Sequence, residues 1–275
     1  MTHEQKYKTF RALHERPGVF VIPNAWNAGT ARILTALGYE ALATTSAGYA
    51  FSVGRRDSSA VLTRNEILQN AKAIVEATPL PVSADLQDGF GRSPAMCAET
   101  IRLASEIGLV GGSIEDATGD PKDPIYEFNL AVERVALAAK ASHDCAFILT
   151  ARAENFLHGR PDLVDTIRRL QAFAEAGADV VYAPGLSSLE AVREVCASVS
   201  KPVNVVMGLK GGTFSVAELA AVGVKRISVG GAFARAALGG FVRAAREVIE
   251  KGTFTFAADA LSHAEAQAYM EQGRR

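Results

Sequence analysis

The sequence has few of the residues that cross-link a protein or hold a structural metal. Its 275 residues include 3 cysteines, at positions 97, 145 and 196, and only 7% are aromatic. Three widely spaced cysteines without a CxxC pair fit neither a disulfide framework nor a zinc site. We therefore expect a reducing, cytoplasmic environment and a fold that is stabilised by its hydrophobic core.

Excess charge and long apolar runs are also missing. The 29 basic and 30 acidic side chains give a formal net charge of -1. Without a basic face, a sequence-independent grip on nucleic acid phosphates is not expected. No apolar run approaches the ~18 residues of a membrane span, and residues 1–16 lack the apolar core of a secretory signal. The expected partners are small molecules, not nucleic acids or membranes.

What the sequence does contain is a repeated alternation of two patterns. Short apolar runs rich in β-branched residues are each followed by a longer stretch of helical periodicity. The predicted strands are 19–23, 41–45, 82–86, 111–114, 147–151, 180–183, 203–206 and 226–229. The predicted helices are 28–37, 63–77, 94–107, 127–141, 161–176, 187–198, 215–221 and 233–251. Eight such units of parallel strand and helix predict an α/β fold, a single (β/α)8 TIM-type barrel.

No linker rich in proline, glycine or serine interrupts the series, so we expect residues 1–275 to form one domain. Residues 253–275 follow the eighth helix as an extension, with a strand-like stretch at 253–256 and a further helix at 258–270. Such terminal helices often pack on a partner subunit. The extension therefore favours a homo-oligomer, either a dimer or a tetramer.

In a barrel of this kind, the chemistry takes place where the strands end. Asp57, Asp85, Asp88 and Glu115 would converge on that rim, where a hard divalent cation resolves their mutual repulsion. Arg152, at the end of the fifth strand, has the planar fork that suits a carboxylate. A metal and an arginine together describe a site for a 2-oxo or 2-hydroxy carboxylate. The alternative is that Arg152 forms purely structural ion pairs.

Four phrases in this order resemble the isocitrate lyase / phosphoenolpyruvate mutase superfamily: PNAWNAGTARILTALGYEALATTSAGYAFSVGRRDSS, PVSADLQDGFG, GGSIEDATGDP and LTARAENF. The second is similar to the D-x-D-x-G-[YF]-G metal signature, and the Asp57 segment is similar to the G-x-P-D-x-S loop. Several motifs in the right order are more specific than any one of them alone. The resemblance covers residues 23–231 and implies the same barrel.

The resemblance also implies roles for individual residues. Asp85 would bind Mg²⁺ or Mn²⁺ directly, and Asp57, Gln87 and Glu115 would act through metal-bound waters. Arg152, Glu115 and Asp57 would form the catalytic set, acting through an enolate-like intermediate. The residues that would contact the substrate are Trp26, Ser46, Ala47, Gly48, Asp85, Arg152 and Asn204.

Two positions depart from the superfamily pattern. Gln87 replaces the second aspartate of D-x-D and removes one negative charge; strand alternation predicts that Gln87, not Asp88, faces the site. The segment EDATGDPKDPIY lacks the cysteine and histidine of the K-[KR]-C-G-H loop of the lyases. The main hypothesis is a carbon–carbon lyase or hydrolase for an oxaloacetate- or malate-type acid. The alternatives are a catalytically weak barrel that binds 2-oxo acids such as 2-oxoglutarate, and a phosphonopyruvate or phosphoenolpyruvate mutase-type enzyme.

Overall fold

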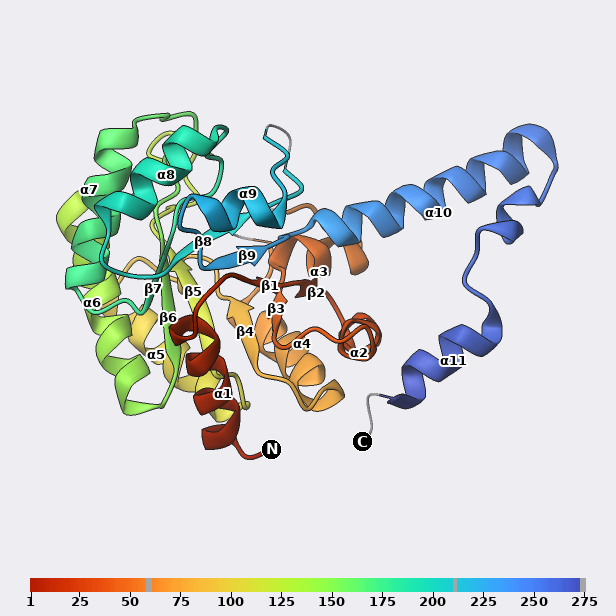
Figure 1. Cartoon of the computed structure of the whole chain (residues 1–275), viewed down its shortest axis with the longest axis horizontal. Helices are drawn as coiled ribbons and strands as arrows, with labels where there is room; N and C mark the ends of the chain where they lie inside the picture. Colours follow the sequence, from red (N-terminus) through yellow and green to blue (C-terminus); the bar gives the residue numbers. More distant parts are fainter. Residues whose placement is uncertain (58–60, 210–211, 273–275) are drawn as a thin grey trace.

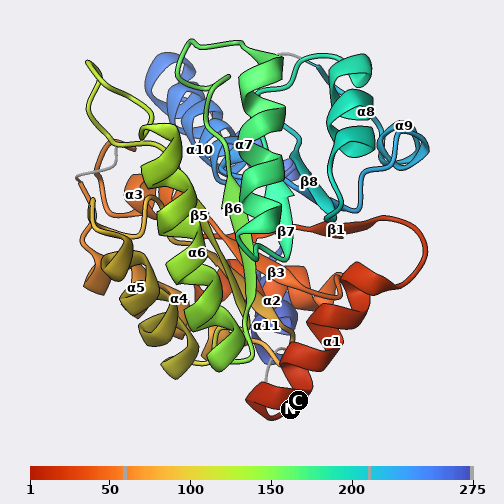
Figure 2. The same cartoon turned by 90° about the vertical axis from the view of Figure 1, so that its left-hand side faces the viewer.

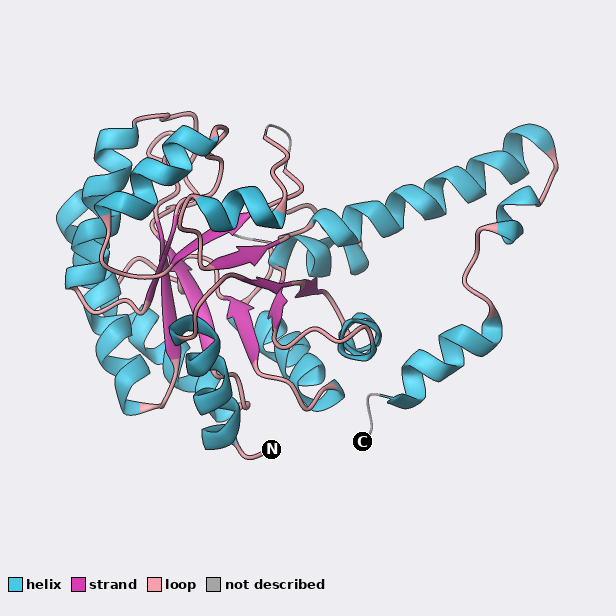
Figure 3. Ribbon diagram, in the orientation of Figure 1, coloured by secondary structure: helices cyan, strands magenta, loops and turns pink. Residues whose placement is uncertain are grey.

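The structure is a computed structural model that describes residues 1–57, 61–209 and 212–272. A ring of strands lies at its centre and helices surround it (Figures 1 and 3). The strands are β1 (Phe20–Ile22), β2 (Asn24–Ala25), β3 (Leu42–Thr44), β4 (Val82–Asp85), β5 (Gly111–Glu115), β6 (Ile148–Arg152), β7 (Val180–Tyr182), β8 (Val203–Val206) and β9 (Arg226–Ser228). The helices are α1 (His3–Glu15), α2 (Ala28–Ala36), α3 (Ser46–Ser52), α4 (Arg64–Ala77), α5 (Pro94–Glu106), α6 (Phe128–Asp144), α7 (Leu163–Glu175), α8 (Leu189–Ser198), α9 (Val216–Ala221), α10 (Ala232–Lys251), η1 (Thr255–Ala258, a 3-10 helix) and α11 (His263–Gln272).

All strand pairs are parallel, in the order β1-β9-β8-β7-β6-β5-β4-β3-β2. β1 corresponds to the predicted strand 19–23, and β2 continues it beyond Pro23, which has no N–H to donate. One segment pairs with β9 and the other with β3, so the split strand closes the ring. The prediction of a (β/α)8 barrel is confirmed.

Asn24 stabilises this junction. Its Nδ2 donates to the Thr44 carbonyl at 2.6 Å, and its Oδ1 accepts from the backbone amides of Val229 at 3.0 Å and Gly230 at 2.9 Å. One side chain thus joins the strands on either side of the split. Because α5, α6 and α7 cover the outside of the sheet (Figure 2), the central strands are buried on both faces.

A helix at the amino terminus, α1, has no counterpart among the predicted elements. A capping box between Thr2 and Gln5 begins it. Its apolar residues Phe10 and Leu13 pack on Phe20 and on other residues at the starts of strands. α1 therefore closes the amino-terminal end of the barrel, opposite to the end where the strands finish.

The structure corrects two further local predictions. The stretch 253–256 is not strand-like, because Thr255–Ala258 forms the 3-10 helix η1; Glu247 accepts hydrogen bonds from Thr253 and Thr255 and holds the chain in this turn. The final helix begins at His263 instead of 258. α3 was also not predicted and begins directly after β3, with Thr45 as its N-cap.

α10 projects away from the barrel, and the chain then returns so that α11 lies beside α2 (Figure 1). Arg32 on α2 donates to the Met270 carbonyl at 2.7 Å. Among the described residues of α10 only Ala234 is buried, whereas Phe241 is 71% and Ile249 is 85% exposed. Within the described chain, no helix is both long and apolar enough to cross a membrane.

Candidate active site

A cavity of about 610 Å³ opens at the carboxyl ends of the strands and extends into the barrel. Its lining includes nearly all of the candidate residues of the sequence analysis: Ser46, Ala47, Asp57, Asp85, Gln87, Glu115, Arg152 and Asn204. The fold positions them by a common device, since Asp85, Glu115 and Arg152 are the last residues of β4, β5 and β6. Chain segments far apart in sequence therefore meet at one end of the barrel.

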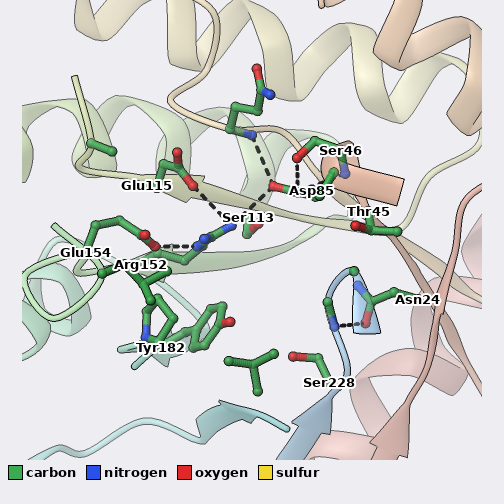
Figure 4. A pocket seen from close by; sticks show the side chains of 18 of the residues that line it. Asn24, Thr45, Ser46, Asp85, Ser113, Glu115, Arg152, Glu154, Tyr182 and Ser228 are labelled. Carbon is green, nitrogen blue, oxygen red and sulfur yellow. Dashed lines mark hydrogen bonds and ion pairs between the residues drawn. The ribbon is translucent and has the colours of Figure 1, made fainter. Parts of the chain in front are cut away.

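Arg152 is the centre of this site (Figure 4). Its Nη1 lies 3.2 Å from Asp85 Oδ1 and 3.1 Å from Glu115 Oε2, and its Nε lies 2.8 Å from Glu154 Oε1. The Arg152 side chain is 14% exposed. Three carboxylates around one guanidinium raise the pKa of Arg152 well above its ordinary value, and this outweighs the opposing effect of burial. The site therefore keeps its cation at any physiological pH.

Asp85 has a second set of partners on the opposite side. Its Oδ2 accepts from the Ser46 hydroxyl at 2.6 Å and from the Ser46 amide at 3.1 Å, at the start of α3. The Asp85 amide in turn donates to Thr44 Oγ1 at 3.0 Å. The first turn of α3 and the end of β4 thereby hold the carboxylate in one orientation.

Gln87 and Asp88 diverge directly after β4. Gln87 lines the cavity, is 5% exposed and has a φ of 50°, a left-handed conformation that is strained for a residue with a Cβ. Asp88 instead accepts from the Phe90 amide at 2.9 Å and from the Tyr126 hydroxyl at 3.2 Å. Gln87 thus contributes to the cavity lining, and it follows β4 through a left-handed turn and not through continued strand alternation.

Arg134 holds this turn from outside. It is fully buried on α6, and its guanidinium donates to the backbone carbonyls of Asp88, Gly91 and Arg92. The ring of Tyr126 lies 4.1 Å from the Arg134 guanidinium carbon. The turn that places Gln87 is therefore fixed by one cation that binds its carbonyls.

The residues fit a hard divalent cation that keeps most of its own water. The Gln87 Oε1 atom is buried and has no hydrogen-bond partner among the described residues. An amide oxygen is one of the ligand types that a hard divalent cation accepts. Burial and the nearby Asp85 charge raise the pKa of Asp57; burial and the neighbouring carboxylates raise that of Glu115. Among the described residues, no three or more Asp, Glu, His and Cys side chains are arranged so that together they could hold a metal ion. Asp57, Asp85, Gln87 and Glu115 nevertheless line the same cavity and carry the oxygen atoms that such a cation prefers.

Two of the predicted substrate contacts lie outside the cavity lining, namely Trp26 and Gly48. The Gly48 amide is already bound, donating to Thr45 Oγ1 at 3.2 Å. A methyl group on Gly48 would lie 2.9 Å from Trp26 Cβ, so the two residues pack on each other. Their direct contact with a substrate stays a prediction.

The structure also adds residues to the predicted set. Glu154, Tyr182, Arg226 and Ser228 line the same cavity. Glu154 follows the predicted strand 147–151 and Tyr182 lies near the end of the predicted strand 180–183, which was the available signal for them. Arg226 begins a strand, at the end of the barrel that the strand-end rule ignores. None of the three cysteines lines the cavity, and burial raises the pKa of Cys97 to about 11.

Comparison with known proteins agrees with this geometry. The model of the phosphoenolpyruvate phosphomutase family matches residues 10–249, and the chain belongs to this family. An uncharacterized protein of Mycobacterium tuberculosis, MT2054, is 32% identical, covering 87% of this chain and 88% of its own. The 2-methylisocitrate lyase of Escherichia coli is 28% identical, covering 71% and 68%. The solved structure of a Burkholderia cenocepacia J2315 protein, whose description as a lyase/mutase leaves the reaction open, has a TM-score of 0.95 and 55% identity and covers 98% and 96%.

Proposed function

We propose that this chain is a Mg²⁺-dependent enzyme that breaks a carbon–carbon bond in a small 2-oxo or 2-hydroxy dicarboxylate. The observation that carries the proposal is Arg152, held by three carboxylates at the strand ends, in a cavity whose lining also includes Gln87. The similarity to a 2-methylisocitrate lyase supports the same reaction class. Oxaloacetate-like and malate-like acids have the chelating head and the second carboxylate that such a site selects.

The residues divide the work between binding and charge stabilisation. Asp85 would hold the metal, with Asp57, Glu115 and Gln87 around it, and Mn²⁺ has the same ligand preferences. When bound, the metal supplies Lewis-acid polarisation of a substrate oxygen. Arg152 donates hydrogen bonds to the oxygen on which negative charge develops as the bond breaks. Ser46, at the start of α3, binds the substrate carboxylate and orients Asp85.

A turnover screen over 2-oxo and 2-hydroxy diacids, with and without Mg²⁺, tests this function. The expected result is metal-dependent formation of a monocarboxylate, abolished in Asp85→Ala and in Arg152→Ala. The matched control is Asp120→Ala, since Asp120 lines the mouth of the cavity but contacts none of the four charged groups at its centre. Turnover without metal, or turnover that survives Asp85→Ala, would contradict the proposal.

The second candidate is a barrel that binds 2-oxo acids with little catalysis. Gln87 in place of an acidic residue favours it, as does the absence of cysteine from the described cavity lining. This candidate gives thermal stabilisation by 2-oxoglutarate with Mg²⁺ but no product after long incubation. A mutase-type enzyme would instead bind phosphonopyruvate much more tightly than oxaloacetate.

We also propose that the chain forms a homo-oligomer through α10. Phe241, Ile249 and Phe254 are exposed on the part of the chain that projects from the barrel. Large apolar side chains gathered on one projecting element favour a covered surface. The partner that covers this surface is a second copy of this chain, whose α10 presents the same exposed residues.

A further inference from the structure

Five paired positions form a polar row across neighbouring strands. Glu115 pairs with Arg152, Arg152 with Tyr182, Tyr182 with Asn204, and Asn204 with Arg226. All five side chains line the cavity. Because barrel strands tilt by ~35–45°, a row of paired residues descends along the barrel axis. This row starts at the last residue of β5 and ends at the first residue of β9.

The upper end of the row is acidic and the lower end is basic. At the top, Asp85, Glu115 and Glu154 surround a single cation, Arg152. At the bottom, Arg226 is 5% exposed and forms no ion pair with any carboxylate of the described chain. The cavity is therefore polarised along its depth.

The partners of Arg226 are all uncharged. Nε donates to Asn204 Oδ1 at 2.8 Å, Nη2 donates to Thr150 Oγ1 at 2.8 Å, and Nη1 lies 3.3 Å from His14 Nε2. Burial lowers the pKa of His14 to about 3, so the imidazole is neutral. These bonds orient the guanidinium and use three of its five N–H groups, but they do not neutralise its charge.

A buried charge without a counter-charge is strongly unfavourable, and proteins rarely keep one unless a ligand supplies the balance. Burial lowers the pKa of Arg226 to about 10, which leaves it protonated at neutral pH. An anion in the lower part of the cavity would be both neutralising and hydrogen-bonded there. The carboxylates at the rim do not supply the counter-charge for Arg226, because all three are paired with Arg152.

We propose that Arg226 binds the second, anionic group of the substrate and so selects dicarboxylates over monocarboxylates. The inference rests on the proposed function, because the first carboxylate is taken to bind at the Asp85 and Arg152 end. The ligand then lies along the barrel axis, with its chelating head at the rim and its tail carboxylate on Arg226. Asn204 holds the guanidinium and Ser228, which accepts from Asn204 Nδ2 at 3.1 Å, continues this polar floor.

Calorimetric titration with matched acids tests the assignment in the presence of Mg²⁺. The pairs are oxaloacetate with 2-oxobutanoate, 2-oxoglutarate with 2-oxopentanoate, and 2-oxoadipate with 2-oxohexanoate, so each pair differs in the tail carboxylate. In the native protein we expect one diacid to bind at least about tenfold more tightly than its monoacid, as a charge-assisted hydrogen bond gives. In Arg226→Gln this ratio falls to near one, while the affinity for the monoacid changes less than about threefold.

Two further variants keep the test decisive. Asn204→Asp places a carboxylate beside Nε, which cancels the charge without removing the guanidinium, and it also abolishes the discrimination. If Arg226→Gln does not fold, Asn204→Asp still tests whether the charge of Arg226 causes the discrimination. Arg235→Gln removes the exposed cation at the rim, which donates to the Gly208 carbonyl, and leaves the ratio intact.

The outcomes separate the two proposals. If none of the six acids binds to the native protein with Mg²⁺, the proposed function fails and the assignment of Arg226 fails with it. If the acids bind but Arg226→Gln and Asn204→Asp preserve the ratio, only the assignment is overturned. Loss of the ratio in Arg235→Gln alone would place the second carboxylate at the rim and would also overturn it.

Discussion

His14 makes the stability of the barrel depend on pH in a way that can be worked out from its contacts. Its Nδ1 lies 2.8 Å from the Phe10 carbonyl, to which it donates, so Nε2 is left to accept from Arg226. The ring lies edge-on to the rings of Phe10 and Phe20, with centroids 4.7 and 5.0 Å away. Burial first, and then the Arg226 charge, lower the pKa of His14 from 6.5 to about 3.

Above pH 6.5 both the folded and the unfolded chain carry a neutral His14 ring, so the stability that the buried neutral ring provides is fully present there. As the pH falls below this value, His14 is protonated in the unfolded chain but stays neutral in the folded chain until about pH 3. In that window the free energy of unfolding falls by ~1.4 kcal/mol per pH unit. From pH 6.5 to about pH 5, His14 alone removes about 2 kcal/mol.

Urea unfolding at about pH 7.5 and about pH 5 measures this loss. His14→Gln keeps an oxygen that accepts from Arg226 but does not titrate, so its free energy of unfolding should fall by about 2 kcal/mol less than that of the native chain. His143→Gln is the matched control, because His143 is exposed on α6, and it should lose as much as the native chain. Equal losses in His14→Gln and the native chain would refute the reasoning.

Three other substitutions test separate parts of the structure. Gly48→Ala places a methyl group 2.7 Å from Thr45 Cγ2 and should lower the free energy of unfolding by about 1–3 kcal/mol in urea titrations; an unchanged value would contradict the close packing. Arg134→Met removes the hydrogen-bond donor of three backbone carbonyls and should loosen the turn at Gln87. Calorimetry should then show a lower melting temperature and weaker Mg²⁺ binding. An unchanged Mg²⁺ affinity would show that Arg134 does not position the site. Phe241→Glu should convert an oligomer to monomers in light scattering, and a monomeric native chain would rule out the α10 interface.

The barrel was predictable because its signals are local and repeated. Runs such as Val180–Tyr182 are apolar throughout because parallel strands are buried on both faces, and caps such as Thr63 with Glu66 mark the helix starts. α1 was missed because its polar residues outnumber the few that pack on the barrel. The capping box of Thr2 and Gln5 was the signal that could have found it.

The candidate site was predictable at the strand ends and not beyond them. Asp85, Glu115 and Arg152 follow from the rule that parallel strands bring their carboxyl ends together, and the structure pairs them within 3.2 Å. Gln87 reaches the cavity by a positive φ, which no alternation pattern encodes. Arg226 depends on strand register and tilt, which only the closed barrel reveals.

The most direct measurement of the central claim is calorimetric titration of the native chain and of Asp85→Ala with a 2-oxo diacid, with Mg²⁺ and with chelator. The account predicts binding that needs Mg²⁺ and that weakens about a hundredfold or more in Asp85→Ala, as loss of a charged ligand contact requires. Equal affinity with chelator, or full affinity in Asp85→Ala, would contradict the claim that the strand ends hold a metal and a carboxylate substrate together.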